Sequence, residues 1–445
     1  MNDRLERLPK EPVHRLTGPF MRFLRIEAAG GAVLLFCTLL ALVLANSAWS
    51  APFLALWETS VGFHVGNIEI SRSLQHWIND GLMTLFFFLV ALELKREIVL
   101  GELRHPRTAV LSLSAALGGM TVPVSLFLLV QGNASASHGW GAVMATDTAF
   151  VIGCLALLGS RIPQSLRLFL LSLAIFDDIG AILVVALGYG ATLNWIALGL
   201  AGLGVGAVAG IARLGVRSIL IYFAIGGLIW LALDASGIHP TVAGVMLGLM
   251  TPARSWVSDT RLHAILNRVI AYPPGEHWSG DTVDRQDLRR AGVAAREALS
   301  PVERLEIVLH PWVAFTIMPL FALANAGVPI SPVNVDGGIM ISVFLAFVVG
   351  KPIGVLLFSY LAVSLRLATR PAELPWSVLA AGSLLTGIGF TMALFIAELA
   401  FDSNLLNSAK LGILGASVGS ATCGLLALAW LTVPSGTTRS RKVRD

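Results

Sequence analysis

Residues 165–189 read SLRLFLLSLAIFDDIGAILVVALGY, with Arg167 near one end and the adjacent pair Asp177 and Asp178 in the middle as its charged residues. A helix needs about 20 mostly apolar residues to cross the hydrocarbon core of a membrane. The stretch therefore predicts a transmembrane helix. A charged side chain at the centre of such a helix costs roughly 2.5–3.5 kcal/mol, so the aspartate pair requires a partner or a function.

Similar apolar stretches recur along the whole chain. Hydrophobic residues make up 56% of the sequence and charged residues 13%, against about 25% charged in ordinary soluble domains. This composition excludes a soluble enzyme. The predicted fold class is an all-α polytopic membrane protein with twelve transmembrane helices, at 27–46, 76–94, 108–131, 139–160, 165–189, 193–213, 217–235, 238–252, 305–327, 337–363, 376–400 and 408–433.

The loop charges predict the orientation of these spans. If both termini are cytoplasmic, 28 of the 31 Lys and Arg residues fall on the cytoplasmic side, as the positive-inside rule requires. Residues 1–26 and 434–445 are then cytoplasmic tails, and 27–433 form one membrane domain. A net charge of +4, spread over loops, does not predict binding to nucleic acid.

Two loops have features of their own. Residues 61–70 alternate apolar and polar side chains around a Gly-Asn pair, which predicts a small outer β-hairpin. Residues 253–304 form a long cytoplasmic loop with mixed charges, in which we expect a helix near 284–299.

Four charged side chains lie in the middle of apolar spans, namely Asp147, Asp177, Asp178 and Lys351. One alternative is a structural ion pair between Lys351 and one aspartate, with the other carboxyl groups neutral or displaced towards the membrane surface. However, one lysine cannot neutralise three aspartates. Because adjacent helical residues point about 100° apart, one of Asp177 and Asp178 can pair with Lys351 while the other faces an ion path.

Carboxylate chemistry suggests which ion that path carries. Hard cations such as Na⁺ and Li⁺ prefer carboxylate, hydroxyl and carbonyl oxygens. Burial favours the neutral form of a carboxyl group, so the same aspartate can hold a proton when the cation is absent. We therefore expect cations and protons to compete for one site.

Polar interruptions divide two of the predicted spans, at 146–148 (TDT) and at 386–391 (TGIGFT). Irregular backbone at membrane depth is tolerated where it is buried in protein or lines a cavity. The interruptions fall in the middle helices of spans 3 to 5 and 10 to 12, and an offset of seven helices makes these two groups inverted. Inverted repeats with broken helices at the midplane are typical of secondary transporters.

Several segments resemble the NhaA-type family of bacterial sodium/proton antiporters. The resemblance extends over residues 17–433 and rests on FFFLVALELKRE (86–97), ATDTAF (145–150), FDDIG (176–180), GKP (350–352) and GIGFTM (387–392). It implies electrogenic, pH-regulated exchange of cytoplasmic Na⁺ or Li⁺ for external protons across the bacterial inner membrane. It further implies two discontinuous helices that cross at mid-membrane, a homodimer held partly by the outer hairpin, and no cofactor or catalytic residue.

The resemblance also assigns roles within the ion and proton site. It implies that Asp178 is the foremost Na⁺ ligand, together with Asp177 and Thr146, and that Asp147 lies nearby. Lys351 resembles the family's charge partner of Asp177. The charges of Asp147 and Lys351 would compensate the partial charges at the facing ends of the broken helices.

Other titratable groups are candidates for a pH response. Glu93 and Glu97 lie at the cytoplasmic end of the second span, and Glu306 lies at the start of the ninth. Such residues are commonly solvated helix ends, whereas the resemblance favours a cytoplasmic funnel that attracts cations. His239 can titrate near neutral pH, but a structural role is favoured over a sensory one.

Three other functions fit the sequence less well. An intramembrane aspartyl protease needs two carboxylates that face each other. The Gly-x-Gly-Asp pattern associated with such proteases is absent from the sequence, and Lys351 would have no role in their chemistry. A passive cation channel would show rings of like residues, which this sequence does not suggest. No phosphate-binding loop is present for an ATP-driven pump. Secondary exchange remains the best prediction.

Overall fold

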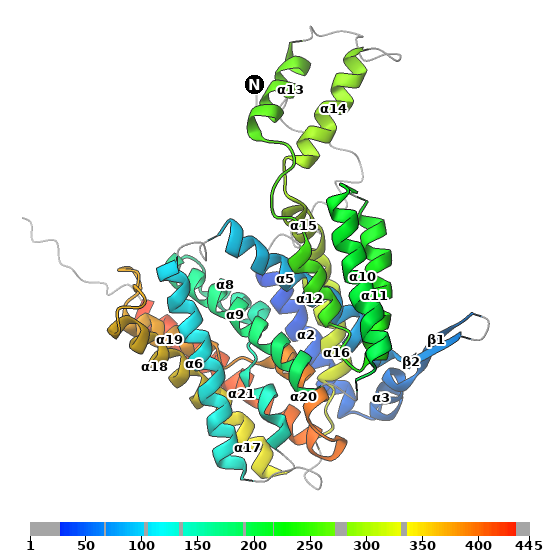
Figure 1. The fold of residues 1–445 in the computed structure, drawn as a ribbon. Helices are drawn as coiled ribbons and strands as arrows, with labels where there is room; N and C mark the ends of the chain where they lie inside the picture. Colours follow the sequence, from blue (N-terminus) through cyan, green and yellow to red (C-terminus); the bar gives the residue numbers. More distant parts are fainter. Residues whose placement is uncertain are drawn as a thin grey trace, which may run out of the picture. The chain divides into compact units, whose positions relative to one another are not determined.

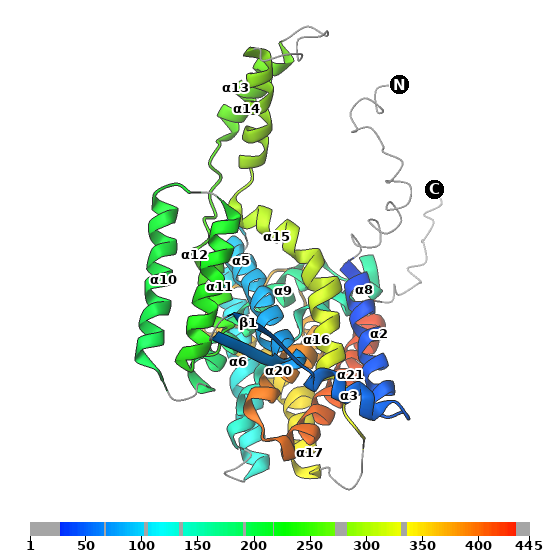
Figure 2. The same ribbon diagram turned by 90° about the vertical axis from the view of Figure 1, so that its right-hand side faces the viewer.

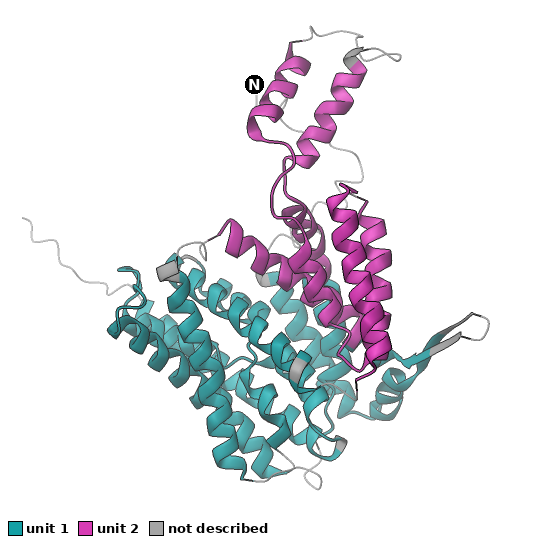
Figure 3. Cartoon of the chain, in the orientation of Figure 1, with its two compact units in different colours: residues 1–79, 106–189, 314–445 teal, residues 80–105, 190–313 magenta. Residues whose placement is uncertain are grey.

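The computed structural model describes residues 27–65, 68–101, 106–132, 137–189, 193–216, 218–271, 283–330 and 336–432. These residues are mostly helical, with one two-stranded sheet. They divide into two compact units, each described separately (Figure 3). The predicted cytoplasmic tails at 1–26 and 434–445 lie outside the described residues.

Unit 1 consists of residues 1–79, 106–189 and 314–445. In Figure 1, α6 lies alongside α18, and Figure 2 shows α2 beside α16, as their contacts also indicate. Its helices are α2 (Glu27–Ala45), α3 (Ser50–Glu58), α4 (Leu74–His76), α6 (Pro106–Gln131), η4 (His138–Met144), α8 (Thr148–Leu158), η5 (Gly159–Arg161), α9 (Gln164–Gly188), α16 (Met318–Asn325), α17 (Gly337–Leu345), η8 (Ala346–Gly350), α18 (Lys351–Ser364), α19 (Trp376–Leu385), α20 (Phe390–Ala400) and α21 (Ser403–Thr432).

Unit 2 consists of residues 80–105 and 190–313. Within it, α10 packs on α11, and α5 packs on both α12 and α15. Its helices are α5 (Met83–Val99), α10 (Trp195–Arg213), α11 (Ile219–Ser236), α12 (Val242–Met250), α13 (Asp259–Ile270), α14 (Val283–Glu297) and α15 (Pro301–Trp312). Two π-helical segments, η2 (Trp77–Leu82) and η6 (Val313–Ile317), connect α4 to α5 and α15 to α16 across the boundary between the units.

Eight helices of the described residues are long and apolar enough to cross a membrane, or up to ten if each of two bent pairs counts as one span. The polytopic helical membrane fold is therefore confirmed at this level. All twelve predicted segments contain helix, but the segment at 238–252 is represented by α12, which has nine residues. The number twelve remains a prediction.

The predicted cytoplasmic loop at 253–304 contains more helix than expected. The expected helix near 284–299 is present as α14, and α13 lies beside it as a second helix (Figure 1). Both have one polar face, since charged residues alternate with apolar ones at helical spacing. Hydropathy did not predict α13 because it is neither long nor apolar.

The predicted hairpin is confirmed as two antiparallel strands. Strand β1 (Ser60–Val65) pairs with β2 (Ile68–Ser73), and the register runs from the pair Ser60 and Ser73 to the pair Val65 and Ile68. The Gly-Asn pair at 66–67 lies outside the described residues. Ser73 then caps α4 by accepting a hydrogen bond from the backbone N–H of His76.

Glycines allow α6 and α18 of unit 1 to approach each other closely. A Cβ added at Gly118 would lie 2.2 Å from the carbonyl oxygen of Gly354, and one added at Gly354 would lie 2.1 Å from that of Gly118. No side chain fits at either position without displacing a backbone. Small residues at such crossings are typical of membrane helices. This contact fixes the position of α18, which begins at Lys351.

Candidate functional site

The first interruption forms an extended segment between two helices of unit 1. The helix η4 ends at Met144, Ala145 has an extended backbone, and α8 begins at Thr148. Asp147 is the N-cap of α8, because its Oδ1 accepts a hydrogen bond of 3.0 Å from the backbone N–H of Phe150. The cap satisfies one of the unpaired donors at the start of the helix.

The second interruption separates α19 from α20, which are bent by 50° relative to each other. The two interruptions are in contact, since the backbone N–H of Asp147 donates to the carbonyl oxygen of Ile388 at 2.7 Å. Thr391, in the first turn of α20, donates to Asp147 Oδ2 through its backbone N–H at 3.1 Å and through its hydroxyl group. Asp147 therefore places one negative charge at the N-terminal ends of both α8 and α20.

Lys351 supplies the opposite charge. Its side chain is 0% exposed, and its Nζ donates to the carbonyl oxygen of Met144, the last residue of η4, at 2.6 Å. The same Nζ lies 3.3 Å from Asp177 Oδ2. A positive charge thus lies at the C-terminal end of η4, where a helix favours a cation, and forms a buried ion pair with α9.

Asp177 and Asp178 have different partners on successive faces of α9. Asp177 Oδ2 accepts a hydrogen bond of 2.5 Å from Thr146 Oγ1 in addition to its contact with Lys351. Asp178, which is 3% exposed, accepts a hydrogen bond of 3.3 Å at Oδ2 from Thr148 Oγ1. Lys351 therefore forms its ion pair with Asp177, and Asp178 lies beside the hydroxyl group of Thr148.

All five residues predicted for the ion and proton site come together within unit 1: Thr146, Asp147, Asp177, Asp178 and Lys351. Sequence reasoning treated Thr391 and Thr148 as parts of the interruptions and missed their side-chain contacts with Asp147 and Asp178. The available signal was a threonine directly beside a break in an otherwise apolar span. The carbonyl groups of Met144 and Ile388 carry no sequence signal, because every residue has a backbone carbonyl.

The carboxylates predicted to respond to pH gather around one arginine in unit 2. Arg96 of α5 donates to Glu306 of α15 and lies 3.1 Å from Glu97 Oε1. Glu93, one turn earlier on α5, interacts electrostatically with the same three residues. The side chains of Glu97 and Glu306 are 14% and 13% exposed, so these are partly buried groups and not freely solvated helix ends.

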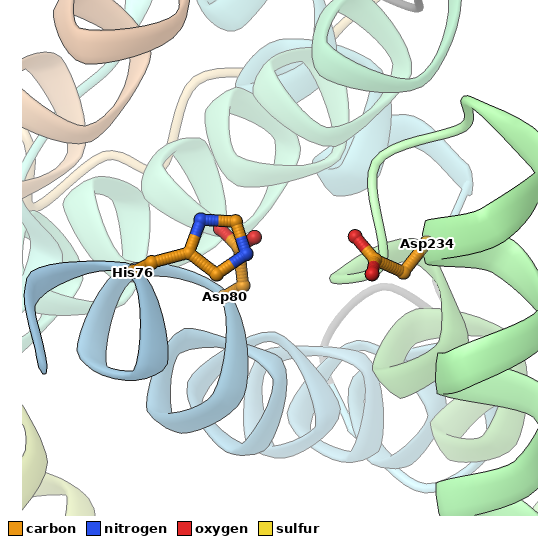
Figure 4. Close-up of side chains that lie close together, drawn as sticks. All are labelled: His76, Asp80 and Asp234. Carbon is orange, nitrogen blue, oxygen red and sulfur yellow. The ribbon is translucent and has the colours of Figure 1, made fainter. Parts of the chain in front are cut away.

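His239, the fourth pH-response candidate, lies in a different part of unit 2. Its Nε2 lies 3.5 Å from Asp80 Oδ1, and its Nδ1 lies 2.8 Å from Thr241 Oγ1. Figure 4 shows Asp80 near Asp234 of α11, with His76 one helical turn before Asp80 along the chain. Asp80 is 6% exposed and pairs with the histidine.

A further polar cluster in unit 1 surrounds the far end of α20. Glu398 of α20 forms an ion pair with Lys410 of α21 and accepts a hydrogen bond of 3.3 Å from Gln75 Nε2. Gln75 also donates to Asn325 Oδ1 at 3.1 Å. The cluster anchors the end of α20 that lies away from Asp147, and sequence reasoning did not predict it.

Comparison with known proteins identifies the family to which this arrangement belongs. A family profile described as "Na+/H+ antiporter 1" matches residues 21–428. The chain belongs to the Na⁺/H⁺ antiporter 1 family. The family membership inferred from the five sequence segments is thereby confirmed, and with it the classification as a transporter and not an enzyme.

Relatives within the Na⁺/H⁺ antiporter 1 family match almost the whole chain. The Na(+)/H(+) antiporter NhaA of Rhizobium meliloti (strain 1021) is 69% identical over 435 residues, which cover 98% of this chain and 100% of the relative. The Na(+)/H(+) antiporter NhaA 2 of Acidiphilium cryptum (strain JF-5) is 59% identical and covers 97% and 96%. The Na(+)/H(+) antiporter NhaA 2 of Vibrio vulnificus (strain CMCP6) is 55% identical and covers 95% of each.

Proposed function

We propose that this chain exchanges cytoplasmic Na⁺ or Li⁺ for external protons across the bacterial inner membrane. In this proposal transport is electrogenic and regulated by pH, and it serves sodium and pH homeostasis. Family membership supports the exchange reaction. The transported species are monovalent cations and protons, and the protein uses no cofactor.

The division of partners among the three buried aspartates is the observation that carries the proposal. Asp147 is held by donors from two helix N-termini, and Asp177 by Lys351 and Thr146. Asp178 lies beside these groups with a hydroxyl group as neighbour. Lys351 also interacts electrostatically with Asp178, but its direct contact, at 3.3 Å, is with Asp177. We therefore assign the cation to Asp178, with Asp177 as the direct partner of the lysine.

The exchange follows from competition at this site. Na⁺ binds to Asp178 first, and Asp177 and Thr146 join as ligands when Lys351 releases Asp177. Proton binding to the aspartates displaces the cation, because a neutral carboxyl group attracts it far less. Protonation of Asp177 likewise frees Lys351 from its ion pair. Cation and proton thus occupy the site in turn, as exchange requires.

Reconstitution into sealed vesicles tests the proposal. An imposed Na⁺ gradient should move protons in the opposite direction, measured with a pH-sensitive dye, and the exchange should respond to a membrane potential because it is electrogenic. Proton movement that does not depend on the Na⁺ gradient would contradict exchange and favour a passive cation channel.

We further propose a membrane arrangement of twelve spans within residues 27–433, with both termini in the cytoplasm and the hairpin outside. The pairs η4 with α8 and α19 with α20 would be two discontinuous spans that cross at mid-membrane within inverted repeats. The contact between Asp147 and Ile388 supports this crossing. Cysteine labelling from each side of the membrane tests the arrangement, and external labelling of the 253–304 loop would contradict it.

The outer hairpin is proposed to support a homodimer, because a two-stranded hairpin is marginally stable alone. Deletion of residues 61–70 should shift the protein towards monomer in mild detergent, measured by light scattering. Exchange should persist, since the contacts described for Asp178 and Lys351 come from segments other than the hairpin. Loss of exchange in a deletion variant that remains dimeric would contradict this role.

The cluster around Arg96 is proposed to tune the pH dependence of exchange, together with His239. Glu306→Gln should move the activation profile to lower pH, because removal of a negative charge weakens proton binding by neighbouring carboxylates. Glu373→Gln is the matched control, since Glu373 is exposed and lies on a segment outside this cluster. Equal profiles for wild type and Glu306→Gln, measured in vesicles between pH 6 and 9, would remove this cluster from the proposal.

A further inference from the structure

Two aspartates of unit 2 come from different helices and lie close together. Asp80 is on η2, and Asp234 is in the last turn of α11. Figure 4 shows the carboxyl group of Asp234 pointing towards Asp80. A carboxylate oxygen of one lies within 4.8 Å of a carboxylate oxygen of the other. Because like charges at this distance repel each other, a cation between the two carboxylates would stabilise both.

The position of Asp234 is itself unfavourable for a negative charge. Its carbonyl oxygen accepts a hydrogen bond from the backbone N–H of Gly237, which ends α11 with a φ of 84°. The C-terminal end of a helix carries a partial negative charge and favours a cation. The helix end and the neighbouring carboxylate therefore both favour a positive charge beside Asp234.

His76 adds a nitrogen ligand to the two carboxylates. It precedes Asp80 by four residues on one continuous helix formed by α4 and η2. One of its ring nitrogens lies within 4.8 Å of the Asp80 carboxylate. Side chains four residues apart lie on the same face of a helix, which is the spacing of paired ligands in zinc-binding helices. The helix therefore fixes His76 and Asp80 as a pair.

The cluster combines access for an ion with an ordered carboxylate. His76 and Asp234 are half-buried, whereas Asp80 is 6% exposed. Asp80 Oδ1 lies 3.5 Å from His239 Nε2, and a carboxylate can bind an ion through one oxygen while a histidine contacts the other. A neighbour of this kind orients a metal-binding carboxylate.

We propose that His76, Asp80 and Asp234 bind a divalent transition-metal ion, for which Zn²⁺ is the best fit. Imidazole nitrogen and carboxylate oxygen are both ligands of Zn²⁺, whereas Mg²⁺ and Ca²⁺ prefer oxygen ligands alone. Tetrahedral ligands at about 2.1 Å from Zn²⁺ lie about 3.4 Å apart, so side-chain rotations bring the three groups together around the ion. The ion is structural: it joins η2 to α11 and takes no part in the exchange reaction.

Zn²⁺ binding by purified, untagged protein in detergent tests the site. Metal-free protein is titrated with ZnCl₂ in a calorimeter, and its Tm is measured with and without the metal. The variants are Asp234→Asn and His76→Gln, each of which removes one ligand and changes the size of the side chain little. His263→Gln is the control, because His263 is exposed on α13.

The wild type should bind about one Zn²⁺ per chain, and its Tm should rise with added ZnCl₂, because an ion bound to the folded state stabilises it. Asp234→Asn and His76→Gln should each raise the Kd for Zn²⁺ at least about tenfold and lose most of the rise in Tm. His263→Gln should match the wild type. Excess MgCl₂ should not displace Zn²⁺, because Mg²⁺ prefers oxygen ligands. If one ligand variant fails to fold, the other carries the same expectation.

Absence of Zn²⁺ binding by the wild type would overturn the assignment and leave the cluster as a network of ion pairs. Equal binding by the wild type and a folded ligand variant would also overturn it, because the metal would then bind elsewhere. Displacement of Zn²⁺ by MgCl₂ would contradict the nitrogen ligand. Binding is measured without ion exchange, so none of these results depends on the proposed function.

Discussion

Asp178→Asn should reduce Na⁺-dependent proton movement in reconstituted vesicles to the level of empty vesicles. The substitution keeps the size and shape of the side chain but removes its negative charge and its titration. Asp178 is buried beside Thr148, whereas Lys351 pairs with Asp177. Loss of the charge at Asp178 therefore removes the group at which cation and proton compete.

The variant should remain folded, because an uncharged amide is easier to bury than a carboxylate. Asp402→Asn is the matched control, since Asp402 is exposed at the start of α21 and should exchange like the wild type. Thermal unfolding should be similar for all three proteins. Near-normal exchange by a folded Asp178→Asn protein would show that another group binds the cation.

Lys351→Gln should lower the thermal stability of the protein strongly. The substitution leaves Asp177 buried without its cation, and removal of one partner from a buried ion pair costs roughly 3–5 kcal/mol. The lysine also donates to the carbonyl oxygen of Met144 at 2.6 Å, a contact that an amide can replace only in part. The measurement is the Tm of purified protein in detergent.

Lys351→Arg distinguishes a structural lysine from one that carries a proton. If the pair with Asp177 is structural, arginine retains the charge and should retain exchange with the same pH profile. An upward shift of the profile would show that the lysine itself releases a proton during the cycle, because a guanidinium group does not deprotonate in the working range. Lys351→Ala with unchanged stability and unchanged pH dependence would contradict both roles.

Much of the fold follows from hydropathy and turn chemistry. Each predicted span contains helix, and strands β1 and β2 pair where the hairpin was predicted. The prediction failed to include α13, because a short helix with one polar face resembles a loop in hydropathy. The length of α12 was overestimated at 238–252, since apolar residues extend beyond the helix ends.

The candidate site could be predicted as a set of residues but not as a set of contacts. Four charges in apolar spans stand out in the sequence because each one is costly there. The spacing of Asp177 and Asp178 shows that they point in different directions, but the rotation of α9, which decides the partner of Lys351, depends on packing with distant segments. The contact between Thr391 and Asp147 could not be predicted either, because it depends on the packing of segments that are 244 residues apart.

Release of protons on cation binding tests most directly whether Na⁺ and protons compete for Asp178. Purified protein in weakly buffered detergent solution should acidify the medium when NaCl is added, and addition of choline chloride at equal ionic strength should not. Asp178→Asn should release no protons under the same conditions. Na⁺ binding by the wild type without proton release, or undiminished release from Asp178→Asn, would contradict the account.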